Sequence, residues 1–202
     1  MKIINNSKNL GGRQMSGFTL IEMIGVLAVI AILAALLIPK VTTAISDART
    51  TSAVGTYQTL QAAAAGHYSK YTAFNITTNN TIITATTNAP ALNYDVAYLL
   101  PEGFLEQPCQ LKIGTGSTVQ LISGGGNSGA GYLLDGVNQG TANNAYTLEL
   151  VVTNVTAQDA YDVAVRLDGN LAATNTVGSA LTGGRVVWNK TTGLMNCYVA
   201  GR

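Results

Sequence analysis

A long apolar stretch near the N-terminus constrains this chain more than any other feature. Residues 18–38 contain one charged side chain, Glu22, and are otherwise almost entirely apolar. An α-helix rises about 1.5 Å per residue and the hydrocarbon core of a bilayer is about 30 Å thick, so the stretch is long enough to cross a membrane. Because backbone polar groups in lipid must bond within their own segment, we expect it to be helical.

The carboxylate inside this stretch needs an explanation, since a charge at the middle of a membrane helix costs about 2.5–3.5 kcal/mol on insertion scales. Glu22 lies only about one helical turn from the start of the stretch, and its side chain could extend to the lipid headgroups at little cost. The alternative is that the carboxylate has a functional partner.

The residues before the stretch indicate its orientation. Residues 1–17 carry Lys2, Lys8 and Arg13 and no acidic residue. By the positive-inside rule the N-terminus stays in the cytoplasm and the rest of the chain is translocated. An ordinary secretory signal peptide is the alternative, but its apolar core would be about 7–15 residues long, with the cleavage site behind it. The core in this chain is longer.

Residues 17–39 read GFTLIEMIGVLAVIAILAALLIP. This segment resembles the N-terminal signature of the type IV pilin family, which includes the pseudopilins of type II secretion and competence systems. The glycine, the aromatic residue, the glutamate and the proline of that signature stand at Gly17, Phe18, Glu22 and Pro39. The resemblance is confined to this N-terminal part of the chain.

The resemblance implies a membrane-embedded prepilin peptidase that cleaves after Gly17 and methylates the new amine of Phe18. The precursor is then expected to be a single-pass inner-membrane protein with a periplasmic head. Its partners would be inner-membrane lipid, the peptidase, an inner-membrane assembly platform and further copies of itself in an extracellular or periplasmic filament. In that filament the Glu22 carboxylate would pair with the Phe18 amine of a neighbouring copy.

Helical periodicity continues beyond the apolar stretch. Pro39 removes a helical hydrogen bond, so we expect a bend there. Many pilins have a glycine where this chain has Ala31, which makes local unwinding between Ala31 and Pro39 less expected here. Apolar residues then recur at helical spacing to the end of the predicted helix: Val54, Tyr57, Leu60, Ala64, Tyr68 and Tyr71.

We therefore divide the chain into four parts: a leader that is removed (1–17), a transmembrane or filament-core helix (18–39), its amphipathic continuation (40–71) and a head domain (72–202). The start of the head is rich in Thr and Asn, and prolines at 90, 101 and 108 predict irregular structure. Residues 72–100 match the connecting loop of pilins and are a candidate contact between subunits.

The rest of the head has the periodicity of strands. Alternation predicts strands around Leu111/Ile113 and Val119/Leu121, at 145–152, and in a closing hairpin of 185–189 and 194–200. An N-cap pattern at Thr156 and a glycine at 169 predict a short helix between them, although alternation at 161–167 also fits a strand. The predicted class is α+β. The apolar half of the long helix protrudes, and its second half packs on an antiparallel sheet.

The two cysteines, Cys109 and Cys197, both lie in the part expected to be translocated. An even number of cysteines in an oxidising compartment favours one disulfide. Such a bridge would be similar to the C-terminal disulfide loop of many type IV pilins. The alternative is two buried free thiols.

Other patterns that suggest ligands are weak. Residues 124–129 fit G-x-G-x-x-G, but no helix follows them to hold a phosphate, so we interpret them as a loop between strands. Asp159, Asp162 and Asp168 lack the loop spacing of a calcium site. The single histidine, His67, has no nucleophile at a recognisable spacing, which argues against a Ser-His or Cys-His hydrolase. We expect no cofactor, no metal and no catalytic residue.

The resemblance to type IV pilins implies a structural subunit of a type IV pilus or pseudopilus, of the kind that serves adhesion, twitching motility or protein secretion. A minor pilin at the filament tip is the alternative, binding DNA or a surface through Lys112, Arg166, Arg185 and Lys190. The formal net charge of +1 gives no general basic character to support DNA binding. A periplasmic enzyme on a membrane tether is a third class.

Overall fold

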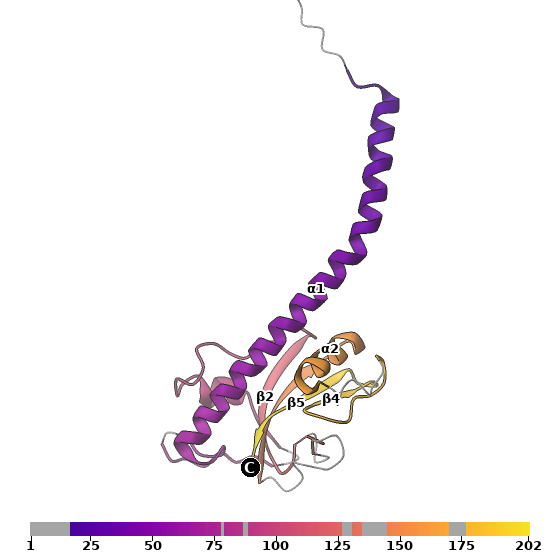
Figure 1. Cartoon of the computed structure of the whole chain (residues 1–202). Coiled ribbons are helices and arrows are strands. Elements are labelled where there is room, and N and C mark those ends of the chain that lie inside the picture. The colour runs from indigo at the N-terminus through magenta and orange to yellow at the C-terminus, as the bar shows by residue number, and fades with distance from the viewer. Residues whose placement is uncertain (1–16, 78, 87–88, 127–130, 135–144, 170–176) are drawn as a thin grey trace, which may run out of the picture. The chain divides into compact units, whose positions relative to one another are not determined.

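The computed structural model describes residues 17–77, 79–86, 89–126, 131–134, 145–169 and 177–202 (Figure 1). The predicted leader up to residue 16 lies outside these ranges. In chain order the elements are α1 (Leu20–Tyr71), β1 (Ala91–Leu92), the π-helix η1 (Asp95–Leu99), β2 (Gly116–Ser123), β3 (Tyr146–Thr153), α2 (Ala157–Asp168), β4 (Val186–Asn189) and β5 (Leu194–Gly201). The chain divides into two compact units, Met1–Thr43 and Ala44–Arg202.

The described part of the first unit is helical from Leu20 onward, as the apolar stretch predicts. α1 begins at Leu20 and passes through Pro39 without a break, and the residues between Ala31 and Pro39 are helical. The carbonyl of Pro39 accepts hydrogen bonds from the hydroxyls of Thr42 (2.8 Å) and Thr43 (3.0 Å). The bend expected at Pro39 stays a prediction. The side chains of residues 17–43 are exposed.

The second unit contains a five-stranded antiparallel sheet in the order β1-β2-β3-β5-β4 (Figure 1). β2 and β3 pair along their whole length, from Gly116 opposite Thr153 to Ser123 opposite Tyr146. β4 and β5 form the predicted closing hairpin. A long N-terminal helix followed by an antiparallel sheet confirms the predicted α+β class.

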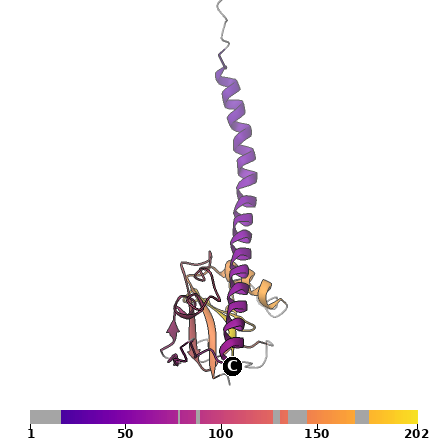
Figure 2. The same ribbon diagram turned by 90° about the vertical axis from the view of Figure 1, so that its left-hand side faces the viewer.

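The core of this unit lies between one face of the sheet and two helices, the second half of α1 and the whole of α2 (Figures 1 and 2). Alternate residues of β3 point to this face: Leu148, Leu150 and Val152. The helices contribute Ala53, Tyr57, Leu60 and Ala64 from α1 and Ala160, Val163 and Ala164 from α2. The Tyr57 hydroxyl donates to the backbone carbonyl of Tyr198, which fixes α1 to β5. The predicted stripe on α1 is thus partly core.

α2 forms where the capping pattern predicts it. The Thr156 hydroxyl accepts a hydrogen bond from the backbone N–H of Asp159 (3.2 Å), which satisfies one of the free donors at the helix start. Gly169 ends the helix with φ +55°. The strand alternative for residues 161–167 is wrong.

Two predictions about the chain before β2 differ from the structure. The strand expected at Leu111/Ile113 is not formed: the Leu111 N–H donates to the Ser117 hydroxyl (3.2 Å), and Gly114 adopts φ +67°. β2 begins only at Gly116. Residues 72–100, expected to be a connecting loop, include β1 and η1. We call residues 72–115, between α1 and β2, the connecting segment.

The glycine-rich residues after β2 lie in the β2–β3 connection, as expected. The Gly124 N–H donates to the carbonyl of Ala145 (2.9 Å), which closes this connection beside the sheet. Residues 127–130 and 135–144 of this connection lie outside the described residues.

Candidate processing and assembly site

The peptide bond expected to be cleaved lies just before α1. Gly17 and Phe18 precede the helix and are exposed, with Phe18 at 84% of its free area. A side chain added at Gly17 would meet no atom within 4 Å. Packing within the described part of the chain therefore does not require glycine at position 17, which is consistent with a requirement that comes from an enzyme acting on the bond.

Glu22 closes a capping box with Thr19 at the start of α1. One carboxylate oxygen, Oε2, accepts hydrogen bonds from the Thr19 backbone N–H (2.8 Å) and from its hydroxyl (2.7 Å). The Glu22 N–H in turn lies 3.3 Å from the Thr19 hydroxyl oxygen. The sequence prediction missed this role of Thr19, although the T-x-x-E spacing is a sequence signature of such a box.

The capping box holds the Glu22 carboxylate at the N-terminal end of α1, close to positive charge. The N-terminus of a helix carries the positive end of its dipole. Cleavage after Gly17 would add the amine of Phe18, the residue next to Thr19. A carboxylate fixed at this end is therefore suited to an amine, either its own or that of a neighbour.

The helix that follows has the composition of a membrane span. α1 is long and apolar enough to cross a bilayer by length and composition, and none of its most apolar window is buried. Its exposed side chains between Phe18 and Ile38 are mostly aliphatic. Exposing such an apolar surface to water is unfavourable, so it is suited to contact with lipid or with other protein.

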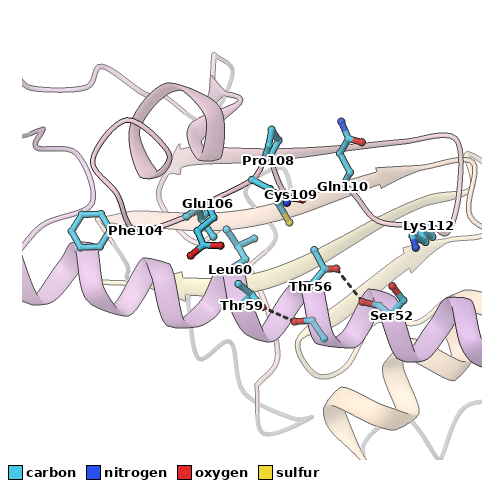
Figure 3. Close-up of a pocket in the computed structure, with 13 residues that line it drawn as sticks. Ser52, Thr56, Thr59, Leu60, Phe104, Glu106, Pro108, Cys109, Gln110 and Lys112 are labelled. Carbon is cyan, nitrogen blue, oxygen red and sulfur yellow. Dashed lines mark hydrogen bonds between the residues drawn. The ribbon is translucent and has the colours of Figure 1, made fainter.

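The head carries an open groove of about 1020 Å³ between α1 and the connecting segment (Figure 3). Ser52, Thr56 and Thr59 line it from α1, and the connecting segment contributes Phe104, Glu106, Cys109 and Lys112, among others. Figure 3 shows the sulfur of Cys109 pointing toward α1. The lining mixes hydroxyls, charged groups and one aromatic ring.

The expected disulfide is not present in the structure, where Cys109 and Cys197 are both buried free thiols. Cys109 lies in the connecting segment and Cys197 on β5. Burial, with a smaller effect from the Asp95 carboxylate, raises the pKa of the Cys109 thiol to about 12. Burial also raises the pKa of Cys197 well above its usual value. Neither thiol is poised for chemistry.

The three aspartates considered for calcium have separate roles. Asp159 accepts from the Ser46 hydroxyl of α1 (3.2 Å) and takes part in the α2 cap. Asp162 accepts from the Gln158 amide (2.8 Å). Asp168 accepts from the backbone N–H groups of residues 185 and 186. Within the described ranges, no group of three or more His, Cys, Asp or Glu could hold a metal ion.

The basic residues considered for DNA come from different places in the head. Lys112 lines the groove, and Lys190 lies between β4 and β5. Arg166 extends from α2 to α1, where its guanidinium lies 3.4 Å from the Asp47 carboxylate. Arg185 directly precedes β4. DNA binding stays a prediction, and the placement of these residues does not strengthen it.

Comparison with known protein families gives one finding. Residues 12–38 match the family model described as the prokaryotic N-terminal methylation motif. This motif is the type IV pilin and pseudopilin signature, and it includes the exposed Gly17–Phe18 bond and Glu22. No curated protein and no solved structure matches the chain.

Proposed function

We propose that this chain is a structural subunit of a type IV pilus or pseudopilus, cleaved after Gly17, methylated on Phe18 and assembled through α1. The match of residues 12–38 to the methylation motif carries the proposal, because that motif indicates a pilin-like substrate of prepilin peptidase. An exposed Gly17–Phe18 bond in front of an exposed apolar helix supports it.

The apolar surface of α1 supplies the driving force for both states of the subunit. In the precursor, lipid would cover the side chains from Phe18 to Ile38, and the head would lie in the periplasm. In the filament, the same side chains of neighbouring copies would cover one another. Extraction by an assembly platform would exchange one apolar environment for the other, so the hydrophobic cost of leaving the bilayer stays small.

Glu22 would direct this exchange. An amine and a carboxylate about 4 Å apart attract by about 4 kcal/mol at an effective dielectric near 20, against about 1 kcal/mol in water. Methylation leaves the Phe18 amine positive, so the attraction persists. A pair between neighbouring copies would fix their axial stagger and would offset the cost of keeping a charge in an apolar filament core.

Mass spectrometry of the protein purified from membranes tests the processing step. The mature chain should begin at Phe18 with the added mass of one methyl group. Gly17→Val should leave the full-length precursor, because valine replaces the glycine at the cleavage site. The variant should still fold, since a side chain at position 17 meets no neighbouring atom within 4 Å. Gly25→Ala, a change inside α1 that also meets no neighbour, is the matched control and should be processed normally. Normal processing of Gly17→Val would contradict the assigned bond.

Electron microscopy of sheared filaments tests the assembly step. Glu22→Gln keeps an acceptor for Thr19 but removes the charge, so it separates the capping role from the pairing role. It should be inserted and cleaved like the wild type, yet give few filaments. Glu22→Asp keeps the charge and should retain part of the assembly. Abundant filaments from Glu22→Gln would show that the charge is not needed.

A further inference from the structure

The only histidine of the chain, His67, is fully buried near the end of α1. Three aromatic rings surround it: its ring centroid lies 4.8 Å from that of Tyr71, 5.8 Å from that of Tyr94 and 5.7 Å from that of Phe104. Tyr71 belongs to α1 and the other two belong to the connecting segment. The imidazole therefore sits where the end of the helix meets that segment.

Polar contacts join the same elements. His67 Nε2 lies 3.4 Å from Oε2 of Glu102, a side chain that is only 7% exposed. The Tyr94 hydroxyl oxygen lies 3.4 Å from Nδ1 and 3.3 Å from Nε2 of the imidazole, and it donates to the carbonyl of Phe74 (2.6 Å). One side chain of α1 thus contacts the connecting segment on both sides of η1.

The charges that face the imidazole are few. The Glu102 carboxylate is negative, and the Lys70 ammonium, one turn along α1, is positive. Asp95 of η1 is engaged elsewhere, since its carboxylate accepts from the Cys109 N–H (2.7 Å). Burial lowers the pKa of His67 below its usual value; Glu102 and the carbonyl of Ile76 partly oppose this, and Lys70 adds to it. The neutral imidazole is therefore the form that suits the buried site.

We propose that the neutral imidazole of His67, enclosed by the rings of Tyr71, Tyr94 and Phe104, is a proton-controlled latch, which fixes the connecting segment to the end of α1 at neutral pH and releases it in mildly acidic surroundings. The Glu102 carboxylate opposes this release, because it attracts the protonated imidazole. The sign follows from linkage. Since the buried imidazole binds a proton less readily than the exposed one, the closed state is fully stabilised above about pH 6.5. This stabilisation is lost as the pH falls through the lower pKa of the closed state.

Release would change a surface of the head. Phe104 packs on His67 on one side and lines the open groove on the other. Lys70 lies 5.6 Å from the Phe104 ring centroid and adds an exposed contact to the same ring. A side chain at Gly66 would come within 3.1 Å of this ring, so Phe104 is closely fitted in the closed state. Opening the latch would free Phe104 and reshape the groove lining.

The test uses the full mature chain in detergent micelles, purified with a tag that contains no histidine. Because His67 is the only histidine, its imidazole signals in an NMR titration are unambiguous, and their midpoint should lie below about pH 6.5. Hydrogen exchange should show that protection of the η1 and Phe104 amides falls several-fold between pH 7.5 and 5, while the β3 amides keep theirs. A midpoint at or above that of an exposed histidine would overturn the proposal.

Three variants assign the effect. His67→Gln cannot be protonated, so its protection of these amides should not change over the same pH range. Glu102→Gln removes the charge that favours the protonated imidazole, so it should move the midpoint to lower pH. Glu106→Gln, which removes a nearby carboxylate in the groove, is the control and should leave the midpoint unchanged. Equal pH profiles for wild type and His67→Gln would overturn the latch. Where His67→Gln does not fold, an unmoved or raised midpoint in Glu102→Gln would do so.

Discussion

Gly184 and Gly178 both adopt positive φ, at +92° and +89°, but their surroundings differ. A Cβ at Gly184 would lie 2.4 Å from Oδ2 of Asp168, whereas a Cβ at Gly178 would meet nothing within 4 Å. The Asp168 carboxylate cannot move away freely, because it accepts hydrogen bonds from the N–H groups of Arg185 (2.9 Å) and Val186 (3.1 Å). These contacts fix the entry into β4.

Alanine at each position should separate backbone strain from the loss of these contacts. Both variants take on the strain of positive φ, which is about 1–3 kcal/mol. Gly184→Ala should lose about 1–3 kcal/mol more, because it displaces a part-buried carboxylate from its donors. Urea unfolding followed by the fluorescence of Trp188, the only tryptophan and a buried one, measures both. Equal losses in the two variants would contradict the role given to Asp168.

The thiols allow a second test at single residues. Burial raises the pKa of the Cys109 thiol to about 12, so very little of it is the reactive thiolate at pH 8. Iodoacetamide should therefore leave the native protein unlabelled at pH 8. In urea without reductant, mass spectrometry should find label on both Cys109 and Cys197. Labelling that appears only after reduction would show that the two form a disulfide in the protein.

The capping of α2 can be tested at the scale of the element. Thr156→Ala removes the acceptor for the Asp159 N–H and should destabilise the head by about 1 kcal/mol. Thr156→Ser keeps the hydroxyl and should lose much less. Both are read as shifts of the urea midpoint of Trp188 fluorescence, which is a direct probe because the Trp188 indole donates to the carbonyl of Val155 beside the cap (3.2 Å). Similar midpoints for the two variants would mean that the cap contributes little.

Elements defined by local pattern could be predicted from the sequence, and those defined by distant contacts could not. The apolar stretch, the α2 cap and the β4–β5 hairpin each depend on residues close in the chain, and all three are present. The strand expected at Leu111 fails because a backbone N–H there bonds to the Ser117 side chain. β1 is only two residues long and pairs with β2, far along the chain, so no periodicity could indicate it.

The same distinction applies to the candidate sites. Gly17, Phe18 and Glu22 lie within one short motif, so their sequence alone predicts a processing site. The proposed latch could not be predicted, because Tyr94 and Phe104, which enclose the His67 imidazole, are distant from it in the chain and carry no spacing signal. The capping role of Thr19 is a different case: the T-x-x-E spacing with Glu22 is a sequence signal for it, but the sequence prediction missed it.

At the scale of the whole molecule, the division after Thr43 separates two kinds of surface. Among the described residues, most of the exposed large apolar side chains lie between residues 18 and 45, although Ile82 and Leu92 of the second unit are also strongly exposed. The core of the second unit begins at Ala53 on α1 and includes residues of α2 and of the sheet. α2 also bonds to α1 near the start of the second unit, through Ser46 with Asp159 and through Asp47 with Arg166. The need for lipid and the stability of the head should therefore be separable.

A fragment that begins at Ala44 tests this separation. It keeps every residue of the core and the contacts of α2 with α1, so it should fold without detergent. Its urea midpoint, read from Trp188, should equal that of the full chain in micelles, because the core residues that the structure describes all lie after Thr43. Thr51→Val within the fragment removes a hydroxyl that accepts a hydrogen bond from Arg166. It should increase the mobility of α1 only near the N-terminus of the fragment. A fragment that aggregates without detergent, or unfolds at a much lower urea concentration, would show that residues 1–43 stabilise the head.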